Sequence, residues 1–306
     1  MKKIGVIDIG TNSMRMLISQ IEGNRIINSY KTMQITRLGQ GINEGEILPS
    51  ALERNLKALK LFKEQAEEEQ AEEILVFGTS ALRDAWNSKD FIQRVKNELG
   101  ITIEILSGKQ EAEIGFMGAI YELSQDALII DIGGGSTEFI IGDKDYGILD
   151  MISIDIGALR ITEAYIKNDP IKIEEVSAIK EAVQDMVRKI SPKFSPQGSQ
   201  DIIGIGGTIT TLSAIKQDME VYNSERIHHS KLSKQDVRDI LNRLRSLNLD
   251  ERKKVKGLQP GRADIIIAGT IILKSIMEIL EIDNIIVSDS DNLEGMLYYH
   301  MEKKSR

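Results

Sequence analysis

Two stretches of the chain carry an aspartate, a glycine and a serine at the same spacing. They read IGVIDIGTNSMRMLI at residues 4–18 and ALIIDIGGGSTEFII at residues 127–141, and they align without a gap. The matched pairs are Asp8 with Asp131, Gly10 with Gly133, and Ser13 with Ser136. Similarity at this separation predicts two related halves of one chain, whereas the alternative is two unrelated hairpins with turn glycines.

The turn in each stretch has the composition of a phosphate-binding loop. Glycine costs stability inside a strand, so the run Gly133–Gly135 needs a reason, and a backbone that must approach a ligand supplies one. Successive N–H groups in such a turn form a nest for an anion, and serine and threonine hydroxyls add donors. The expected phosphate-binding residues here are Asn12, Ser13, Gly133, Gly134, Gly135, Ser136 and Thr137.

The aspartates of the two stretches are poor neighbours for phosphate unless a cation lies between the charges. Asp8 and Asp131 are therefore expected metal ligands. The chain has no cysteine and only three histidines, so the ligands must be oxygens, which favours Mg²⁺ or Mn²⁺.

A third glycine turn occurs at GIGGTITTL, residues 204–212, where a strand is expected to lead into a helix. Backbone amides at a helix N-terminus attract anions. Gly206, Gly207 and Thr208 are therefore further candidates for phosphate binding, although an ordinary strand-to-helix turn would look the same.

The composition is that of a water-soluble protein. The net charge of −8 argues against general nucleic-acid binding, and the absence of cysteine suits a reducing compartment such as the cytoplasm. The apolar start of the chain is too short for a signal peptide, and no apolar run is long enough for a membrane span.

Hydrophobic periodicity predicts strands that alternate with amphipathic helices, which is the pattern of an α/β protein. Strands are expected at 4–9, 14–21, 26–38, 73–78, 101–106, 201–205 and 284–288, with further strands between 127 and 155. Helices are expected near 109–123, 157–168, 173–190, 233–246 and 262–281, after a capping box at Ser50–Glu53, before Gly100, and at the end of the chain. A Pro/Gly/Ser-rich loop is expected at 191–200, and Trp86 is expected in the core.

Together these motifs resemble the actin, sugar kinase and heat-shock ATPase superfamily, and within it the exopolyphosphatase / guanosine pentaphosphate phosphohydrolase (Ppx/GppA) family. The matching stretches run nearly end to end and are DIGTNSMRMLI (8–18), RLGQG (37–41), FGTSALRDAWN (77–87), SGKQEAE (107–113), DIGGGSTEF (131–139), SIDIGALRITE (153–163), GIGGTITTL (204–212), PGRAD (260–264) and VSD (287–289).

The resemblance implies two ribonuclease-H-like (actin-like ATPase) α/β domains with an active-site cleft between them. The expected boundaries are 1–124 for the first domain, with the final helix 291–306 packing back on it, and 125–290 for the second. Many relatives continue into helical domains, so the minimal two-domain form is expected here.

The resemblance also implies roles for charged residues. Glu111, in SGKQEA, is expected to activate water, and Glu138 is expected to bind metal or water. Arg83, Arg15 and Arg37 are expected to clamp phosphate, because guanidinium groups match phosphate oxygens. The roles of Arg160 and Arg262 stay open between phosphate binding and a domain interface.

Two positions depart from the family pattern. Glu113 and Leu293 stand where arginine is usual, so two anion contacts are in doubt.

The resemblance implies release of terminal orthophosphate from inorganic polyphosphate or from guanosine pentaphosphate, an alarmone of the stringent response. Two alternatives remain, namely a small-molecule (sugar-type) kinase of the same superfamily and a non-catalytic polyphosphate or alarmone sensor. The sequence leaves the preferred substrate and the oligomeric state open, with a homodimer among the alternatives.

Overall fold

The computed structural model describes residues 1–23, 25–42, 45–120, 126–196 and 200–305. The chain divides into two compact units: unit 1 comprises residues 1–118 and 292–306, and unit 2 comprises residues 119–291. The expected domain boundary at residues 124 and 125 lies outside the described residues. No helix in the described ranges has both the length and the apolar character that a membrane crossing requires.

Unit 1 is built on a five-stranded sheet of order β3-β2-β1-β4-β5. Its strands are β1 (Lys2–Ile9), β2 (Ser13–Glu22), β3 (Arg25–Ile35), β4 (Glu73–Gly78) and β5 (Glu104–Ile105). The first three form an antiparallel meander, and β4 and β5 run parallel to β1. The parallel strands bring the segments that follow β1, β4 and β5 to the same edge of the sheet, where the predicted functional residues of this unit lie.

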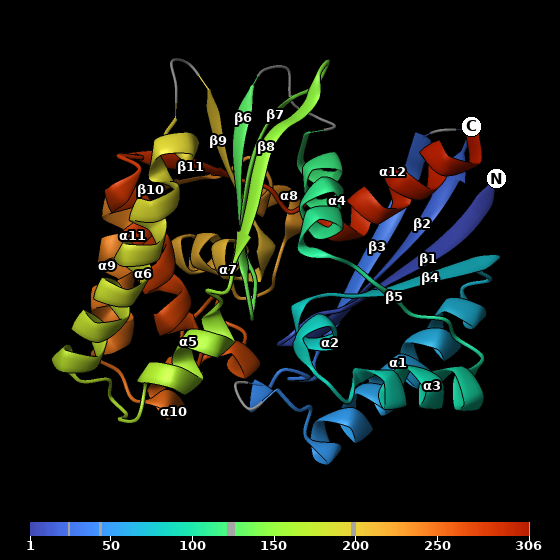
Figure 1. Ribbon diagram of the computed structural model, residues 1–306, viewed down its shortest axis with the longest axis horizontal. Coiled ribbons are helices and arrows are strands. Elements are labelled where there is room, and N and C mark those ends of the chain that lie inside the picture. Colours follow the sequence, from blue (N-terminus) through green and yellow to red (C-terminus); the bar gives the residue numbers. More distant parts are fainter. Residues whose placement is uncertain (24, 43–44, 121–125, 197–199, 306) are drawn as a thin grey trace. The chain divides into compact units, whose positions relative to one another are not determined.

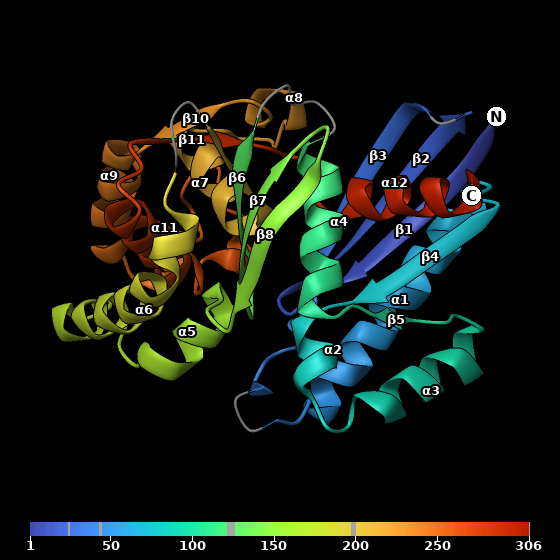
Figure 2. The same cartoon turned by 45° about the horizontal axis from the view of Figure 1, so that its top comes forward.

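Helices cover both faces of the unit 1 sheet (Figures 1 and 2). The helices are α1 (Pro49–Glu68), α2 (Ser80–Asp84), α3 (Ser88–Leu99), α4 (Gly108–Ile120) and α12 (Asn292–Ser305). Because side chains of β1 alternate, Ile7 and Ile9 pack with α1 and α3, whereas Ile4 and Val6 pack with α12. Asp8 shares the face of Ile4 and Val6, so its carboxylate lies on the side of the sheet that α4 and α12 cover.

Unit 2 repeats this topology. Its sheet has the order β10-β11-β9-β6-β7-β8, in which β8-β7-β6 is an antiparallel meander and β9 and β11 run parallel to β6. The strands are β6 (Ala127–Ile132), β7 (Thr137–Asp143), β8 (Gly147–Ile154), β9 (Asp201–Ile205), β10 (Lys231–Ser233) and β11 (Asn284–Val287). The predicted α/β class is confirmed, and the two sheets share an antiparallel meander followed by two strands parallel to its first strand.

The helices of unit 2 enclose a large apolar core. They are α5 (Ala158–Tyr165), α6 (Ile173–Phe194), α7 (Gly206–Lys216), α8 (Ser224–Ile227), α9 (Lys234–Arg245), α10 (Leu249–Arg252) and α11 (Ile266–Ile279). Helix α11 is apolar on nearly all sides because it packs against α5, α6, α7 and α9. In Figures 1 and 2, α6 and α11 lie side by side.

Several local expectations were wrong. Helix α1 begins after Leu48 with Pro49 in its first turn and no side-chain cap, so the capping box at Ser50–Glu53 does not form. The strand expected at 101–106 is only Glu104–Ile105. Helix α6 continues through Pro192 to Phe194, into the loop expected at 191–200, of which residues 197–199 lie outside the described residues. The expected helix end at 121–123 also lies outside them.

Trp86 was also assigned wrongly, because 69% of it is exposed. Its backbone N–H donates to the Gly45 carbonyl, and its indole lies beside Gly45. The indole therefore covers a surface loop instead of filling the core.

Helix α12 meets α4 at a glycine. A Cβ on Gly295 would lie 1.8 Å from the Ile114 carbonyl oxygen and 3.0 Å from the Gly118 nitrogen, so only glycine permits this approach of the two backbones. The contact seats Leu293, Met296 and Leu297 in the core of unit 1.

We therefore expect Gly295→Ala to reduce the free energy of unfolding by about 1–3 kcal/mol, because α12 must move away from α4. Chemical denaturation monitored by circular dichroism would measure the change. Glu302→Ala, on an exposed position of α12, is the matched control and should have little effect. Equal stability of Gly295→Ala and the wild type would show that the helices separate at no cost.

Candidate functional site

The two Asp-Ile-Gly stretches form the same turn. In unit 1 the Gly10 N–H donates to the Ser13 carbonyl, and in unit 2 the Gly133 N–H donates to the Ser136 carbonyl, each at 3.0 Å. A Cβ on Gly10 would lie 2.8 Å from the Ser13 oxygen, which explains the glycine. The sequence match between the stretches therefore corresponds to one structural device used twice.

The two turns differ in the charges that face each other across the strands. Asp8 stands opposite Arg15, whose Nη2 and Nε lie 2.6 Å and 3.1 Å from its Oδ2. In unit 2 the corresponding position places Asp131 opposite Glu138. Residues directly opposite on antiparallel strands share one face, so unit 1 holds an ion pair where unit 2 holds two carboxylates.

Glu138 is almost fully buried, and the Ser153 hydroxyl donates to its Oε1 at 2.6 Å. Asp131 lies against the start of α7, since a Cβ on Gly206 would be 2.2 Å from Asp131 Oδ1. Gly206 has φ +85°, a conformation that glycine adopts without strain. Gly206 thus allows the Asp131 carboxylate to approach the positive end of the α7 dipole.

The triple-glycine loop is held by the first turn of α5. The Gly133 carbonyl accepts from the Ala158 N–H, and the Gly134 carbonyl accepts from the N–H groups of Leu159 and Arg160. Arg160 Nε donates to the Gly135 carbonyl at 2.8 Å. A Cβ on Gly157 would lie 2.4 Å from the backbone of Gly134, so glycine is required there too.

This arrangement fixes where the loop amides point. In a trans peptide the C=O of one residue and the N–H of the next point in opposite directions. Since the carbonyls of residues 133–135 face α5, the N–H groups of Gly134, Gly135 and Ser136 are turned away from it. The loop therefore presents three adjacent amides on one side, which is the form of an anion nest.

Other predicted phosphate ligands are engaged in structural contacts. The Thr137 hydroxyl donates to the Ile156 carbonyl, and Thr137 is fully buried. The Thr208 side chain packs against Gly269 of α11. Arg262 donates to the Gly207 carbonyl and to Thr211 Oγ1. The Thr137 side chain thus supports its own loop, and Arg262 supports the backbone of Gly207. Because Gly206 and Gly207 have no side chains, any phosphate contact that they make comes from their backbone amides.

Glu111 lies in the first turn of α4. The turn is fixed by Ser107 and Gln110, which exchange hydrogen bonds between side chain and backbone in the manner of a capping box. Arg83 Nη1, from α2, donates to Glu111 Oε2 at 3.0 Å and to the Leu106 carbonyl at 3.1 Å. The ends of β4 and β5 therefore bring Glu111 and Arg83 together.

Burial raises the pKa of Glu111 to about 7, because little water is left to solvate the charge, even though the Arg83 guanidinium opposes the shift. The charges of Asp8 and Asp84 push the pKa in the same direction as burial. The carboxyl group is thus poised to exchange a proton near neutral pH.

Arg37 lies in a strained segment beside the first turn. Its φ is +48°, and the Asn12 carbonyl accepts from the N–H groups of both Thr36 and Arg37. Asn12 is 7% exposed, and its Oδ1 has no hydrogen-bond partner among the described residues. Ser13 begins β2 next to it, so the structure brings Asn12, Ser13 and Arg37 together in unit 1.

The residues that depart from the family pattern have local explanations. Leu293 is buried in the apolar cluster of Ile4, Val6 and Leu17. Glu113 lies on the solvent side of α4, 3.8 Å from Lys109 one turn earlier. Leu293 therefore contributes to the core of unit 1, and Glu113 forms an ion pair on the surface of α4.

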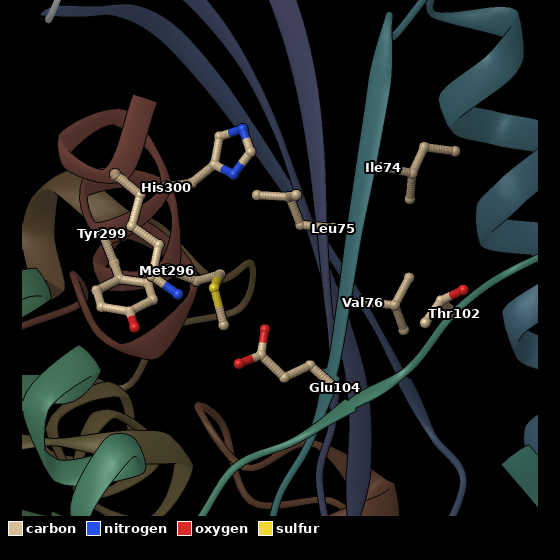
Figure 3. A pocket seen from close by; sticks show the side chains of 9 residues that line it. Ile74, Leu75, Val76, Thr102, Glu104, Met296, Tyr299 and His300 are labelled. Atoms are coloured by element: carbon tan, nitrogen blue, oxygen red, sulfur yellow. The ribbon is translucent and has the colours of Figure 1, made fainter. Parts of the chain in front are cut away.

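A cavity of about 220 Å³ in unit 1 lies away from these residues (Figure 3). Leu75 of β4, Glu104 of β5, and Met296 and His300 of α12 are among the residues that line it. None of the sequence-predicted site residues contributes to its wall.

Two of the metal ligands expected from the sequence, Asp131 and Glu138, have the chemistry of an oxygen-ligand metal site. Within the described ranges, no three acidic or histidine side chains converge as a preformed metal cage. Asp131 and Glu138 supply two carboxylates on one face, and Mg²⁺ is commonly held by one or two carboxylates with water and phosphate oxygens. Asp8 is already paired with Arg15, so its carboxylate would have to be shared.

Sequence reasoning missed the supporting residues. Ser153 and Gly157 were not singled out, although both lie in the quoted motif SIDIGALRITE, and only the folded chain shows that they contact Glu138 and the glycine loop. The sequence leaves the roles of Arg262 and Arg160 open, and in the structure both side chains donate hydrogen bonds to loop carbonyls.

Comparisons with known proteins identify the family to which the chain belongs. The profile of the Ppx/GppA phosphatase family matches residues 17–304. The chain is 39% identical to the bifunctional 3-dehydroquinate synthase/phosphatase of Fusobacterium nucleatum, with 97% of this chain aligned to 46% of that protein. It is 32% identical to exopolyphosphatase 2 of Mycobacterium tuberculosis, over 96% of this chain and 97% of the relative.

Solved structures that resemble this chain support the same family assignment. The Aquifex aeolicus member of the Ppx/GppA family has a TM-score of 0.82 and 31% identity, covering 100% of this chain and 99% of its own. An exopolyphosphatase from Cytophaga hutchinsonii has a TM-score of 0.89 and 30% identity, covering 99% and 98%. The resemblance drawn from the motifs is confirmed: the chain belongs to the Ppx/GppA phosphatase family.

Proposed function

We propose that this protein is a phosphohydrolase that releases terminal orthophosphate from inorganic polyphosphate, guanosine pentaphosphate or both. The observation that carries the proposal is the buried Glu111, whose pKa is raised to about 7 while Arg83 holds its carboxylate in place. A general base works best when its pKa lies near the operating pH.

In the proposed reaction, Glu111 accepts a proton from water as the water oxygen attacks the terminal phosphorus. The bond from phosphorus to the bridging oxygen breaks, and that oxygen leaves with the electron pair on the shortened phosphate chain. Little covalent help is needed in phosphoryl transfer, so positioning and charge neutralisation supply most of the acceleration.

The remaining groups would neutralise charge. In unit 2 the amides of Gly134, Gly135 and Ser136 would bind phosphate oxygens. In unit 1 Asn12 and Ser13 of the first turn would do the same, with Arg15 and Arg37 as cationic partners. Asp131 and Glu138 would hold a divalent cation, Mg²⁺ or Mn²⁺, which would supply positive charge to the phosphate oxygens. Thr137 is not part of this proposal, because its hydroxyl is bound to Ile156.

Each of the two substrate classes is represented among the relatives. One relative is named an exopolyphosphatase, and another, from Photobacterium profundum, is named a guanosine-5'-triphosphate,3'-diphosphate pyrophosphatase. The proposed contacts are to phosphate, which the two substrate classes share. A cytoplasmic location suits these substrates and the cysteine-free composition.

Replacement of Glu111 tests the base. We expect Glu111→Gln to reduce phosphate release by on the order of 10²–10⁴-fold, because the amide accepts no proton from water. Long-chain polyphosphate, guanosine pentaphosphate and ATP with a panel of sugars would be offered in parallel with Mg²⁺.

The control for this experiment is Glu113→Gln, two residues further along α4 and paired with the surface residue Lys109 in the same helix. It should retain wild-type release. Transfer of phosphate to a sugar would indicate the kinase, and binding without release by the wild type would indicate the sensor.

The pH profile tests the raised pKa. The active form of Glu111 is ionised, so kcat/KM should rise with pH and level off above about 7. Arg83→Met removes the cation that favours the ionised form, so the rising limb should move to higher pH. Stopped assays across buffered pH values would locate the rising limb of the wild type and of Arg83→Met. If the limb lies at the same pH in both proteins, the titrating group is not Glu111.

Replacement of Glu138 tests the metal assignment. Glu138→Gln should raise the Mg²⁺ concentration needed for half-maximal phosphate release by about tenfold or more, since one of two carboxylate ligands is lost. Asp150→Asn, on β8 and paired with Lys193 at the surface, is the control and should leave the requirement unchanged. An unchanged requirement in Glu138→Gln would remove Glu138 from the metal site.

A further inference from the structure

The segment Thr36–Gln40, called the Arg37 segment below, is held between the first turn and helix α1. On the side of the turn, the Asn12 carbonyl accepts from the Thr36 N–H at 3.2 Å and from the Arg37 N–H at 2.9 Å. The Thr11 carbonyl accepts from the Gly39 N–H at 2.8 Å. The proposed phosphate-binding turn and the Arg37 segment are therefore one hydrogen-bonded structure.

Arg37 has a conformation that it would not keep by itself. A φ of +48° lies in the left-handed region, which costs free energy for any residue with a Cβ. Strained residues persist only where the surroundings over-determine them, and they gather at functional sites. The question is what holds Arg37 there.

Side chains of α1 supply the second set of bonds. Arg54 Nε donates to the Thr36 carbonyl at 3.2 Å, and Arg54 Nη2 donates to Gln40 Oε1 at 2.9 Å. The same Nη2 lies 3.4 Å from the Arg37 carbonyl, at the long limit of a hydrogen bond. Asn55 Nδ2 adds a bond to the Thr36 carbonyl at 3.3 Å.

The guanidinium of Arg54 thus reaches both ends of the Arg37 segment at once. A planar group with several fixed donors can do this, whereas the single ammonium of a lysine cannot span the same acceptors. With Asn12 holding the N–H groups and Arg54 holding the carbonyls, the peptide units on either side of Arg37 are fixed.

We propose that Arg54 is a positioning residue that holds Arg37 in its left-handed conformation and thereby aims the Arg37 side chain at the bound phosphate chain. The inference rests on the proposed function, in which Arg37 binds phosphate. Arg54 itself contacts the protein backbone, so its effect on ligand passes through Arg37.

The test measures binding without turnover. All variants carry Glu111→Gln, and the affinity for inorganic tripolyphosphate with Mg²⁺ is measured by titration calorimetry. Arg54→Met should weaken binding by on the order of tenfold, and Arg54→Lys should recover part of that loss. Arg188→Met is the matched control, because the Arg188 guanidinium donates to Asp185 and Gln184 on the exposed surface of its own helix, α6.

A double-mutant cycle separates positioning from general damage to the fold. Once Arg37→Ala has removed the side chain that is to be aimed, adding Arg54→Met should cost no further affinity. Hydrogen exchange of the Arg37 amide should be faster in Arg54→Met and unchanged in Arg188→Met.

Full additivity of the two replacements, unchanged affinity in Arg54→Met, or an unchanged exchange rate at Arg37 would each overturn the proposal. Failure of the proposed function would appear elsewhere, as absent phosphate release by the wild type or as full release by Glu111→Gln, while the binding cycle would still report on Arg54.

Discussion

One hydrogen bond underlies the proposed chemistry of both units, namely the bond from a glycine N–H to the carbonyl of the serine three residues later. It closes the turn between the first two strands of each sheet, at Gly10 and Ser13 and again at Gly133 and Ser136. Because the turn is closed, the strand positions before and after it are fixed in register, and the side chains of Asp8 and Asp131 face known partners. Neighbouring loops then dock on the turn backbone.

Because neighbouring segments pack so closely on the turns, many of the predicted site residues are glycines or use their side chains to bind the protein's own backbone. In unit 2 the loop carbonyls accept hydrogen bonds from α5, so the loop amides point away from that helix. In unit 1 the carbonyls of Thr11 and Asn12 bind the segment that carries Arg37. In each turn, then, the fold binds one set of peptide groups, and the proposed phosphate contacts use the others.

The sequence predicted the elements well where one local rule decided the outcome. SGKQEA placed Glu111 in the first turn of a helix because Ser107 and Gln110 cap that helix, and Gly100 ends α3 with φ +69° as its type suggests. Prediction failed where tertiary contacts decided. Nothing local reveals that Trp86 covers Gly45 at the surface, or that Thr137 gives its hydroxyl to Ile156. The pairing of Asp8 with Arg15 and the pKa of Glu111 depend on register and burial, which a motif does not contain.

The contrast between the two turns has a consequence for how the halves respond to their surroundings. Unit 1 pairs its aspartate with Arg15 across the two strands. Unit 2 places Asp131 opposite Glu138, so at the position where unit 1 has an acidic and a basic residue unit 2 has two acidic ones. In the proposed function a divalent cation would bind at Asp131 and Glu138, and its binding would then be linked to the folding equilibrium of unit 2. If unit 2 binds the cation in this way, two copies of one hairpin differ in their response to it, and the thermal stability of unit 2 would rise with the concentration of that cation.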